Sequence, residues 1–321
     1  MHIQADTVDD LLREVFGRLL KDGERVVPSK GTNKELFGVV LELSKPLARV
    51  SRTEMKGRLY SALGELLWYL AGSNDLAFID YYLKDGYESD DDKTVWGAYG
   101  PRLFKLRDGI DQIAQVRNML AARPSSRRAV MQLFNAEDIS VPHKDVPCTC
   151  TLQFLVRKTG LDMFVNMRSN DAYKGLPHDI FAFTMLQEIL ARDLGIAIGR
   201  YKHAAGSLHL YEVDEENVGE FLGEAWQDIE EMPVMPDGSQ WKAIEILKSV
   251  EEKIRGGNEI DIDALGLNGY WADLVRLLVV YRLTRDRSGG ANRDKVEALS
   301  KLMSSDFFRP YISDRKKRIK Q

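Results

Sequence analysis

The sequence predicts an α/β (α+β) protein with a helical C-terminal extension. Its 321 residues are 44% hydrophobic and 29% charged, the balance of a globular chain that can bury a sizeable core. Segments with helical periodicity alternate with strand-like apolar runs as far as Asp214, and beyond it only helical spacing continues. We therefore expect a mixed α/β domain over residues 1–214 and a helical subdomain over residues 215–321.

The charge of the chain argues against a broad nucleic-acid surface. The net charge is −4 and the pI is near 5.9, whereas duplex binding depends on many clustered Lys and Arg residues. The start, MHIQADTVDDLLREVF, lacks a signal pattern, and no window reaches the roughly 20 apolar residues of a membrane span. We expect a cytoplasmic protein without nucleic-acid or membrane partners. The basic end RKKRIKQ is expected to be a solvated, frayed terminus.

The first part of the chain predicts two helices and a strand. Helical spacing runs through Leu20, with Asp6 or Thr7 as candidate caps, and VVPSKGTNKELFG predicts a loop that leads into a strand. The run RLYSALGELLWYL is apolar nearly all round, which predicts a buried helix. A carboxylate there, Glu65, must be paired, protonated or next to a cavity. Helical periodicity alone leaves open that Glu65 faces solvent.

The middle of the chain predicts most of the strands. In VWGAYGPRLF, glycines near Tyr99 predict irregular backbone, and residues 110–120 predict a helix. The run PSSRRAVMQLF then changes to strand-like composition. Two strands, a long amphipathic helix and a last strand are expected at TLQFLV, LDMFVNMR, IFAFTMLQEILARDLG and YKHAAGSLHLYE.

The C-terminal part predicts only helices. They follow a loop at residues 232–238 and correspond to WKAIEILKSVEEKI, WADLVRLLVVYRL and RDKVEALSKLM.

One of the two cysteines is a candidate nucleophile. Cys148 and Cys150 lie two apart on a strand-like run, so they share a face, and no disulfide framework is indicated. A cysteine on an apolar strand is most often a small buried hydrophobe. Pro147 interrupts the strand just before Cys148, however, which would leave that thiol accessible.

Three arginines are candidates for an anion site near this thiol. Arg127, Arg128 and Arg168 each neighbour small polar residues, and an arginine cluster would bind phosphate and lower the thiol pKa. The alternative for Arg127 and Arg128 is a solvated surface pair.

The sequence implies neither a metal nor a nicotinamide cofactor. The CxC pattern has no second cysteine pair, and the five histidines are too scattered for a recognised zinc spacing. No glycine-rich dinucleotide fingerprint follows a predicted strand.

Five motifs, in order, resemble the thymidylate synthase family. They are GELLW, SRRAV, PCTCTLQF, NMRSNDAYKGLPHD and GSLHLY, and the resemblance covers about residues 10 to 214. It implies a thymidylate-synthase fold, with a large mixed sheet whose one face supports dimerisation and helices on the other side. The expected assembly is a homodimer.

By this resemblance, three residues perform the chemistry. Cys148 would add to C6 of a pyrimidine nucleotide and make C5 a nucleophile towards 5,10-methylenetetrahydrofolate. Glu65 would order water and move protons near C5, and Tyr99 would assist removal of the C5 proton.

The resemblance also implies the residues that bind phosphate. Arg168 and Ser169 would hold the nucleotide phosphate, which Arg127 and Arg128 would reach from the neighbouring subunit. The N-terminal loop offers Lys30 as its basic phosphate contact.

Other matched residues would bind the sugar, the base and the folate. His209 and Tyr211 would bind the 3′-hydroxyl of the sugar, and Gln153 would support the base pocket. Asp171 would hydrogen-bond the pterin ring, and Gly175 would let that ring approach closely.

The departures from the family pattern indicate which base is read. Synthases usually have Asn at the position of Asp179, in a Pro-Phe-Asn run where this chain has Pro-His-Asp. An Asp can accept from the cytosine 4-amino group and, when protonated, donate to N3. Thr149 and Ser207, where synthases have His and Asp, extend the similarity to phage-type deoxycytidylate hydroxymethylases. Asp179 could also cap the helix that follows it.

The resemblance therefore implies a hydroxymethyltransferase of nucleotide biosynthesis that acts on dCMP or CMP. Water, organised by Glu65, would attack the exocyclic methylene formed at C5, and tetrahydrofolate would leave unoxidised. The first alternative is a thymidylate synthase that methylates dUMP. The second is an inactive nucleotide-binding or assembly protein that uses the helical extension.

Overall fold

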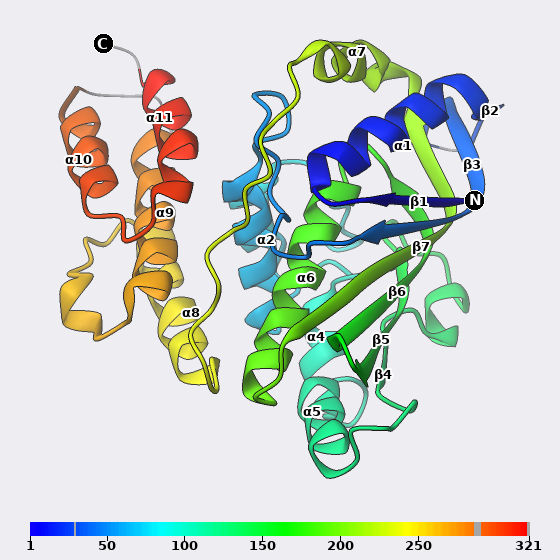
Figure 1. The fold of residues 1–321 in the computed structure, drawn as a ribbon, viewed down its shortest axis with the longest axis horizontal. Coiled ribbons are helices and arrows are strands. Elements are labelled where there is room, and N and C mark those ends of the chain that lie inside the picture. Colours follow the sequence, from blue (N-terminus) through cyan, green and yellow to red (C-terminus); the bar gives the residue numbers. More distant parts are fainter. Residues whose placement is uncertain (29, 286–289, 320–321) are drawn as a thin grey trace. The chain divides into compact units, whose positions relative to one another are not determined.

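Within residues 1–28, 30–285 and 290–319, which the computed structural model describes, seven strands form one mixed sheet (Figure 1). The order is β1-β3-β7-β6-β5-β4, with β2 paired to β3. The bounds are β1 His2–Ala5, β2 Glu24–Val26, β3 Asn33–Leu43, β4 Val130–Gln132, β5 Thr149–Arg157, β6 Gly160–Asp171 and β7 Ile198–Tyr211. The pairs β1-β3 and β6-β7 are parallel and the others antiparallel, which confirms the expected mixed sheet.

The two faces of the sheet differ in burial. Along β7, Tyr201 and His203 are buried, whereas the intervening Lys202 is partly exposed. Helices α1 (Val8–Asp22) and α6 (Leu176–Asp193) pack against the strands. Figure 1 shows α2, α4, α5 and α6 gathered on one side of the sheet. Because side chains alternate along a strand, one face forms the core and the other is open.

Helix α2 (Leu59–Leu70) is buried on nearly all sides, as its apolar sequence predicts. Every residue in it except Ser61 is buried, and the helix packs against α6. Helix α3 (Leu76–Tyr82) lies so close that a Cβ atom at Gly64 would overlap the ring of Tyr82. The glycine of the GELLW motif is therefore required by the contact between α2 and α3.

The N-terminal helix is confirmed, but a strand precedes it. Helix α1 begins at Val8, and the Thr7 side chain caps it by accepting a hydrogen bond from the Asp10 amide at 3.1 Å. The preceding His2–Ala5 pairs with β3 at residues 40–43. The sequence does not predict this strand, because four residues are too few to show a period.

Two expectations about local structure are wrong. Tyr99 lies at the start of helix α4 (Tyr99–Phe104) instead of in irregular backbone, since Pro101 is tolerated in a first helical turn. Part of the basic C-terminal run ends helix α11 (Arg309–Lys317), where Arg315 Nε donates to Thr284 Oγ1 at 2.9 Å. The last two residues of that run lie outside the described residues.

The chain forms two units, Met1–Glu231 and Met232–Gln321, so the first unit continues past residue 214. The reason is helix α7 (Glu215–Gly223), which packs on α1. The guanidinium of Arg13 donates to the Leu222 carbonyl at 3.0 Å, and the rings of Phe16 and Phe221 meet edge to face at 5.3 Å.

The second unit is helical, as predicted. It contains α8 (Trp241–Arg255), α9 (Gly269–Arg285), α10 (Gly290–Lys301) and α11, with α9 contacting the other three. The buried Asp273 accepts hydrogen bonds from the Ser304 and Ser305 amides at 3.0 and 3.1 Å, which joins α9 to the segment before α11.

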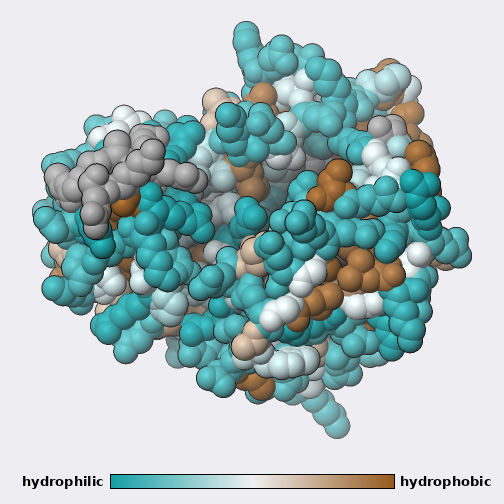
Figure 2. Space-filling view, turned by 90° about the horizontal axis from the view of Figure 1, so that it is seen from above, coloured by the Kyte–Doolittle hydropathy of each residue, from teal (hydrophilic) through white to brown (hydrophobic). Residues whose placement is uncertain are grey.

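The surface seen in Figure 2 is mostly hydrophilic, with hydrophobic groups confined to separate patches. A search of the described residues for a helix long and apolar enough to cross a membrane found none.

Candidate active site

Cys148 lies immediately before β5, in a loop that Arg168 holds in place. The strand begins at Thr149, so the expected break near Pro147 is confirmed. The Arg168 amide donates to the Cys148 carbonyl at 2.9 Å, and its guanidinium donates to the carbonyls of Pro147 and Val146, each at 2.9 Å. The same guanidinium lies 3.8 Å from the thiol sulfur. Arg168 thus fixes the nucleophile loop and also supplies its nearest positive charge.

The thiol of Cys148 is a weaker acid than the arginine pattern predicts. Burial raises the pKa of Cys148 to about 11 and outweighs the lowering by Arg168, while the charges of Asp179 and Asp145 raise it further. The expectation of a lowered thiol pKa is therefore wrong for this chain alone, because burial of the thiol outweighs the one arginine that lies beside the sulfur.

The other two arginines lie elsewhere. Arg127 and Arg128 precede β4 at the edge of the sheet, both exposed, and within the described part of the chain neither contacts Cys148. Gln153 lies beside them, since its side-chain amide donates to the Arg127 carbonyl at 3.1 Å. In a single chain, these arginines therefore face outward and lie away from the nucleophile of the same chain.

Glu65 is buried, so the alternative that it faces solvent is wrong. Its side chain on α2 is reached by two phenols, both of which donate to Oε1: Tyr69 at 2.7 Å and Tyr87. The second oxygen, Oε2, is also buried and has no hydrogen-bond partner among the described residues. One carboxylate oxygen is held, and the other remains available as an acceptor.

Tyr99 lies between Thr149 and the aromatic side chains of the core. Its hydroxyl accepts hydrogen bonds from the Thr149 amide at 3.1 Å and from Thr149 Oγ1 at 2.9 Å. Its ring lies 5.1 Å from that of Tyr69 and stacks with Phe183 at 6.2 Å. Burial, and then the charges of Asp179 and Cys148, raise the pKa of Tyr99 well above its usual value. The resting group is a neutral phenol.

Asp179 is a buried carboxyl in the first turn of α6. Its Oδ2 accepts a hydrogen bond from Asn170 Nδ2 at 2.8 Å. Burial raises the pKa of Asp179 well above its usual value, and the charge of Glu65 adds to this effect, so the neutral acid is favoured. Its predicted role as helix cap is wrong, because α6 begins at Leu176 with Gly175 in the cap position.

A tight turn before α6 sets the direction of Asp179. Asp171 Oδ1 accepts the amides of Tyr173 and Lys174 at 2.8 and 2.9 Å, which closes the turn. A Cβ atom at Gly175 would lie 3.3 Å from Asn170 Nδ2 and 3.5 Å from Asp179 Oδ2. A side chain at Gly175 would therefore crowd the hydrogen bond that orients the acid.

A cavity of about 380 Å³ brings together three residues expected to bind the substrates. Lys30, Asp171 and Tyr211 line it together with Gly31, Thr32, Lys174, Glu212 and Val213. The ammonium of Lys30 pairs with Glu88 at 3.0 Å.

Next to this cavity, the strands place the remaining residues expected to bind the nucleotide. The ring of His209 meets that of Tyr211 edge to face at 5.1 Å. Ser169 pairs with Ser207 between β6 and β7, and Ser207 donates to Glu35 on β3. A carboxylate from β3 therefore lies where the synthase pattern has an Asp on β7.

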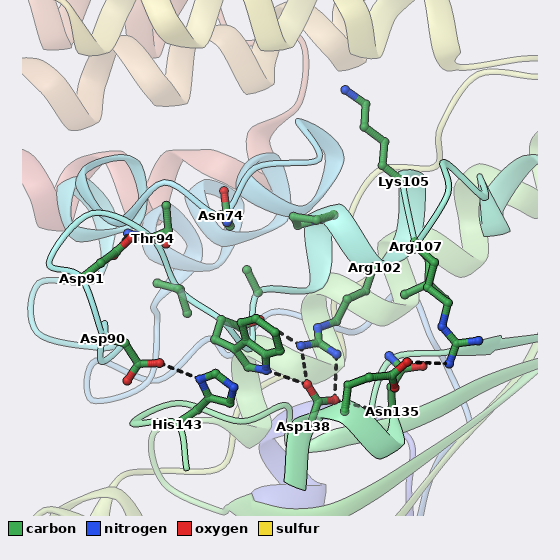
Figure 3. Close-up of a pocket in the computed structure, with 16 residues that line it drawn as sticks. Asn74, Asp90, Asp91, Thr94, Arg102, Lys105, Arg107, Asn135, Asp138 and His143 are labelled. Carbon is green, nitrogen blue, oxygen red and sulfur yellow. Dashed lines mark hydrogen bonds and ion pairs between the residues drawn. The ribbon is translucent and has the colours of Figure 1, made fainter. Parts of the chain in front are cut away.

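Another cavity, of about 500 Å³, contains none of the predicted site residues but contacts the helix that carries Tyr99 (Figure 3). There Asp138 accepts from both Arg102 nitrogens at 2.8 and 2.7 Å and from the Trp96 indole at 2.7 Å. His143 stacks on Trp96 with ring centroids 4.0 Å apart and contacts Asp90 at 2.8 Å. Because Arg102 belongs to α4, this network fixes the helix from which Tyr99 projects.

The structure thus assembles Cys148, Arg168, Tyr99, Glu65 and Asp179 into one electrostatically coupled group. Among the described residues, no cluster of three or more His, Cys, Asp or Glu side chains could hold a metal ion. Three polar residues of the site are not predicted by the sequence: Tyr69, Tyr87 and Asn170. Tyr69 lies one helical turn from Glu65, so spacing could have revealed it, whereas the other two meet their partners only in the fold.

Comparison with known proteins identifies the family of the chain. The deoxyuridylate hydroxymethyltransferase of Bacillus phage SP01 is 32% identical over 217 residues, which is 63% of this chain and 56% of the relative. The chain thus spans a little over half the length of this curated relative. A family profile described as thymidylate synthase matches residues 14–252, which include every predicted site residue. This chain therefore belongs to the thymidylate synthase family.

Proposed function

We propose that this protein is a pyrimidine nucleotide C5 hydroxymethyltransferase that converts dCMP to 5-hydroxymethyl-dCMP. The observation that carries the proposal is the carboxyl of Asp179, which is buried, held by Asn170, and given a pKa well above its usual value by that burial. A neutral carboxyl has one donor and one acceptor. It can accept from the 4-amino group of cytosine and donate to N3, the two groups that distinguish this base.

The proposed chemistry assigns a step to each of the residues that would surround the base. Cys148 adds as thiolate to C6, and Arg168, 3.8 Å from the sulfur, stabilises the negative charge. Tyr99 lies between Thr149 and Tyr69 and assists removal of the C5 proton. Glu65 then accepts a proton from the attacking water through its unpartnered oxygen.

The proposed co-substrate is 5,10-methylenetetrahydrofolate, which supplies the one-carbon unit when bound. The polar lining of the 380 Å³ cavity is suited to a polar heterocycle: Asp171 supplies a carboxylate, and Lys30 and Lys174 supply ammonium groups that are ion-paired with Glu88 and Asp214. We also propose that the catalytic site is complete within residues 1–231 except for the phosphate contacts of a partner subunit.

The proposed assembly is a homodimer formed through the open face of the sheet. Phe37 on β3 is 88% exposed, and Val130 on β4 is 41% exposed, so this region offers apolar surface for a partner. Arg127 and Arg128, exposed at the same sheet's edge, would then reach the nucleotide phosphate of the neighbouring subunit.

A second candidate substrate is dUMP. The SP01 relative is named for deoxyuridylate, and a neutral carboxyl can also accept from uracil N3–H while donating to O4. Asn170 donates to Oδ2 of Asp179, so the proton of the neutral acid lies on Oδ1, and the base that is read depends on which of the two oxygens faces its position 4. Methylation of dUMP, the thymidylate synthase reaction, is the remaining enzymatic alternative.

One product assay tests these alternatives. The purified protein is incubated with 5,10-methylenetetrahydrofolate and each of dCMP, CMP and dUMP, and the nucleotide product is identified by mass. We expect 5-hydroxymethyl-dCMP with no dihydrofolate formed. A 5-methyl product from dUMP, with dihydrofolate formed, would contradict the proposal. If 5-hydroxymethyl-dUMP were the main product, the reaction type would stand but the substrate would be dUMP instead of dCMP. The Cys148→Ser protein is the inactive control.

A further inference from the structure

We infer that Tyr87 and Tyr69 are positioning residues that hold Glu65 by one oxygen, so that its other oxygen deprotonates the water that attacks the exocyclic methylene. The two tyrosines would thereby determine whether the methylene becomes a hydroxymethyl group. This inference rests on the proposed function and deepens it.

The two phenols reach Glu65 from different parts of the chain. Tyr69 follows Glu65 by one turn of α2 and donates to Oε1 at 2.7 Å. Tyr87 comes from the loop between α3 and α4 and donates to the same oxygen, with its hydroxyl 3.4 Å from that of Tyr69. The ring of Tyr87 packs 5.0 Å from that of Trp68, which fixes its approach.

This geometry divides the carboxylate into a structural and a reactive oxygen. A carboxylate oxygen has two lone-pair directions, and two phenols occupy those of Oε1. Oε2 is buried and without a partner among the described residues, so it is the oxygen that can accept a proton. Burial raises the pKa of both tyrosines well above their usual value, so both phenols keep the proton that they donate.

The step assigned to Glu65 balances without a redox partner. The water oxygen forms a bond to the exocyclic methylene carbon, and the water proton passes to Oε2. The electron pair of the methylene double bond moves into the ring, restores the C5–C6 double bond and expels Cys148 as thiolate. Neither a hydride nor an oxidant is consumed. A carboxylate free to rotate would present Oε2 to the water for only part of the time, so the proton acceptor would be misplaced.

The test compares Tyr87→Phe, Tyr69→Phe and the double variant with the wild-type protein. Each is given dCMP labelled with tritium at C5, together with 5,10-methylenetetrahydrofolate. Tritium release reports steps up to loss of the C5 proton, and 5-hydroxymethyl-dCMP reports water attack. Added mercaptoethanol competes with water for the methylene and gives a thioether of distinct mass.

We expect tritium release to stay within about two-fold of wild type, while hydroxymethyl product per tritium released falls about ten-fold in the double variant. The thioether should increase correspondingly. Tyr82→Phe is the matched control, because its ring packs on Gly64, next to Glu65 in α2, and it should keep the wild-type ratio.

The outcomes separate the two proposals. If the wild-type protein forms no hydroxymethyl product from any nucleotide, the proposed function fails and the inference fails with it. If the wild-type protein is active but the ratio is unchanged in both single variants and in the double variant, only the inference is overturned. A fall of equal size in Tyr82→Phe would also overturn it, since the effect would then come from packing.

Discussion

At the scale of single residues, burial governs the chemistry of the site. Asp179 is only 8% exposed, and its burial, to which the charge of Glu65 adds, raises its pKa well above the usual value. Under the proposed function, the proton on Asp179 is what would allow this carboxyl group to recognise cytosine. Its pKa should therefore control both substrate choice and the response to pH.

The first prediction concerns the choice of base. Asp179→Asn replaces the acid by an amide that donates to O4 and accepts from N3–H of uracil. We expect kcat/KM for dCMP to fall by about 100-fold or more and kcat/KM for dUMP to rise, because a mismatched polar site leaves buried groups unpaired. Steady-state kinetics with both nucleotides measure this. Asp145→Asn, another buried acid near Cys148, should leave the preference unchanged.

The second prediction concerns stability and pH. The pKa of Asp179 is raised in the folded protein, so this group binds a proton more tightly there than in the unfolded chain. Its contribution to stability is complete at low pH and is lost as pH rises through the folded pKa. Asp179→Asn should thus raise the melting temperature relative to wild type more at pH 8 than at pH 5. An equal difference at both pH values would show that Asp179 is already ionised in the fold.

The third prediction concerns the nucleophile. With a pKa of about 11, the free thiol of Cys148 should be alkylated slowly at pH 7 and faster as pH rises towards that value. Arg168→Ala should slow alkylation at every pH below it, because the guanidinium lowers the thiol pKa. Mass spectrometry of the cysteine peptide follows the rate, with Cys148→Ser correcting for Cys150. An alkylation rate that reaches a plateau near neutral pH would contradict a raised pKa of the Cys148 thiol.

The sequence predicts which residues form the site better than it predicts their electrostatics. The motifs identify Cys148 and Glu65, but the raised pKa of the thiol comes first from its burial, which outweighs the charge of Arg168. The fold keeps Arg168 close to the sulfur and leaves Arg127 at the sheet edge. The partnership of Glu65 with Tyr87 joins residues 22 positions apart, through a loop whose path no periodicity indicates.

At the scale of elements, short segments carry much of the precision of the site. Helix α4 has only six residues and could not hold Tyr99 in place by itself. The ion pair between Arg102 and Asp138 fixes it from outside the site (Figure 3). Burial raises the pKa of Asp138, but the hydrogen bonds from Arg102 and the Asn135 amide lower it by more.

The fourth prediction tests this brace. Asp138→Ala leaves the buried Arg102 guanidinium without its carboxylate, with only the Leu133 and Trp96 carbonyls as acceptors, so the free energy of unfolding should fall by about 3–5 kcal/mol. Activity should also fall at temperatures where the protein is still folded, because helix α4, which carries Tyr99, is no longer held by the ion pair. Denaturant titration measures the first effect. Glu137→Ala is the control: its pair with Arg107 is exposed, and its loss should cost less than about 1 kcal/mol.

Elements are predicted well where they are long and poorly where they are short. Helix α2 and strands β5, β6 and β7 follow directly from apolar runs and alternation. Helix α6 begins at Leu176, earlier than its apolar run suggests, because Pro177 is favoured in a first turn. The first unit extends to Glu231 because α7 packs on α1, a tertiary contact that composition does not show.

At the scale of the whole molecule, a single chain leaves the proposed phosphate site incomplete. The fifth prediction is that Phe37→Asp, at a position 88% exposed on β3, converts the proposed dimer to an inactive monomer. Sedimentation measures the mass and the product assay measures activity. Ile139→Asp, 73% exposed but outside the sheet, should change neither. A fully active monomer would contradict the shared site.

Mixing inactive variants provides an independent check of the same prediction. The Arg127→Ala, Arg128→Ala double variant and Cys148→Ser should each be inactive alone. After subunit exchange, heterodimers should contain one intact site and restore about one quarter of wild-type activity. No recovery would place the arginines outside the neighbouring site.

The order of strands in the sheet also bears on how the chain folds. Strands β1 and β3 are made first and pair with each other, but the other edge of β3 pairs with β7, whose residues emerge from the ribosome about 170 positions later. The backbone hydrogen-bonding groups on the β7 side of β3 therefore have no partner strand during most of synthesis. The sheet that carries the nucleophile loop can be completed only after β7, which lies between β3 and β6, has been synthesised. We therefore expect the sheet to assemble slowly, and the nascent chain to depend on chaperones until Tyr211 has been made.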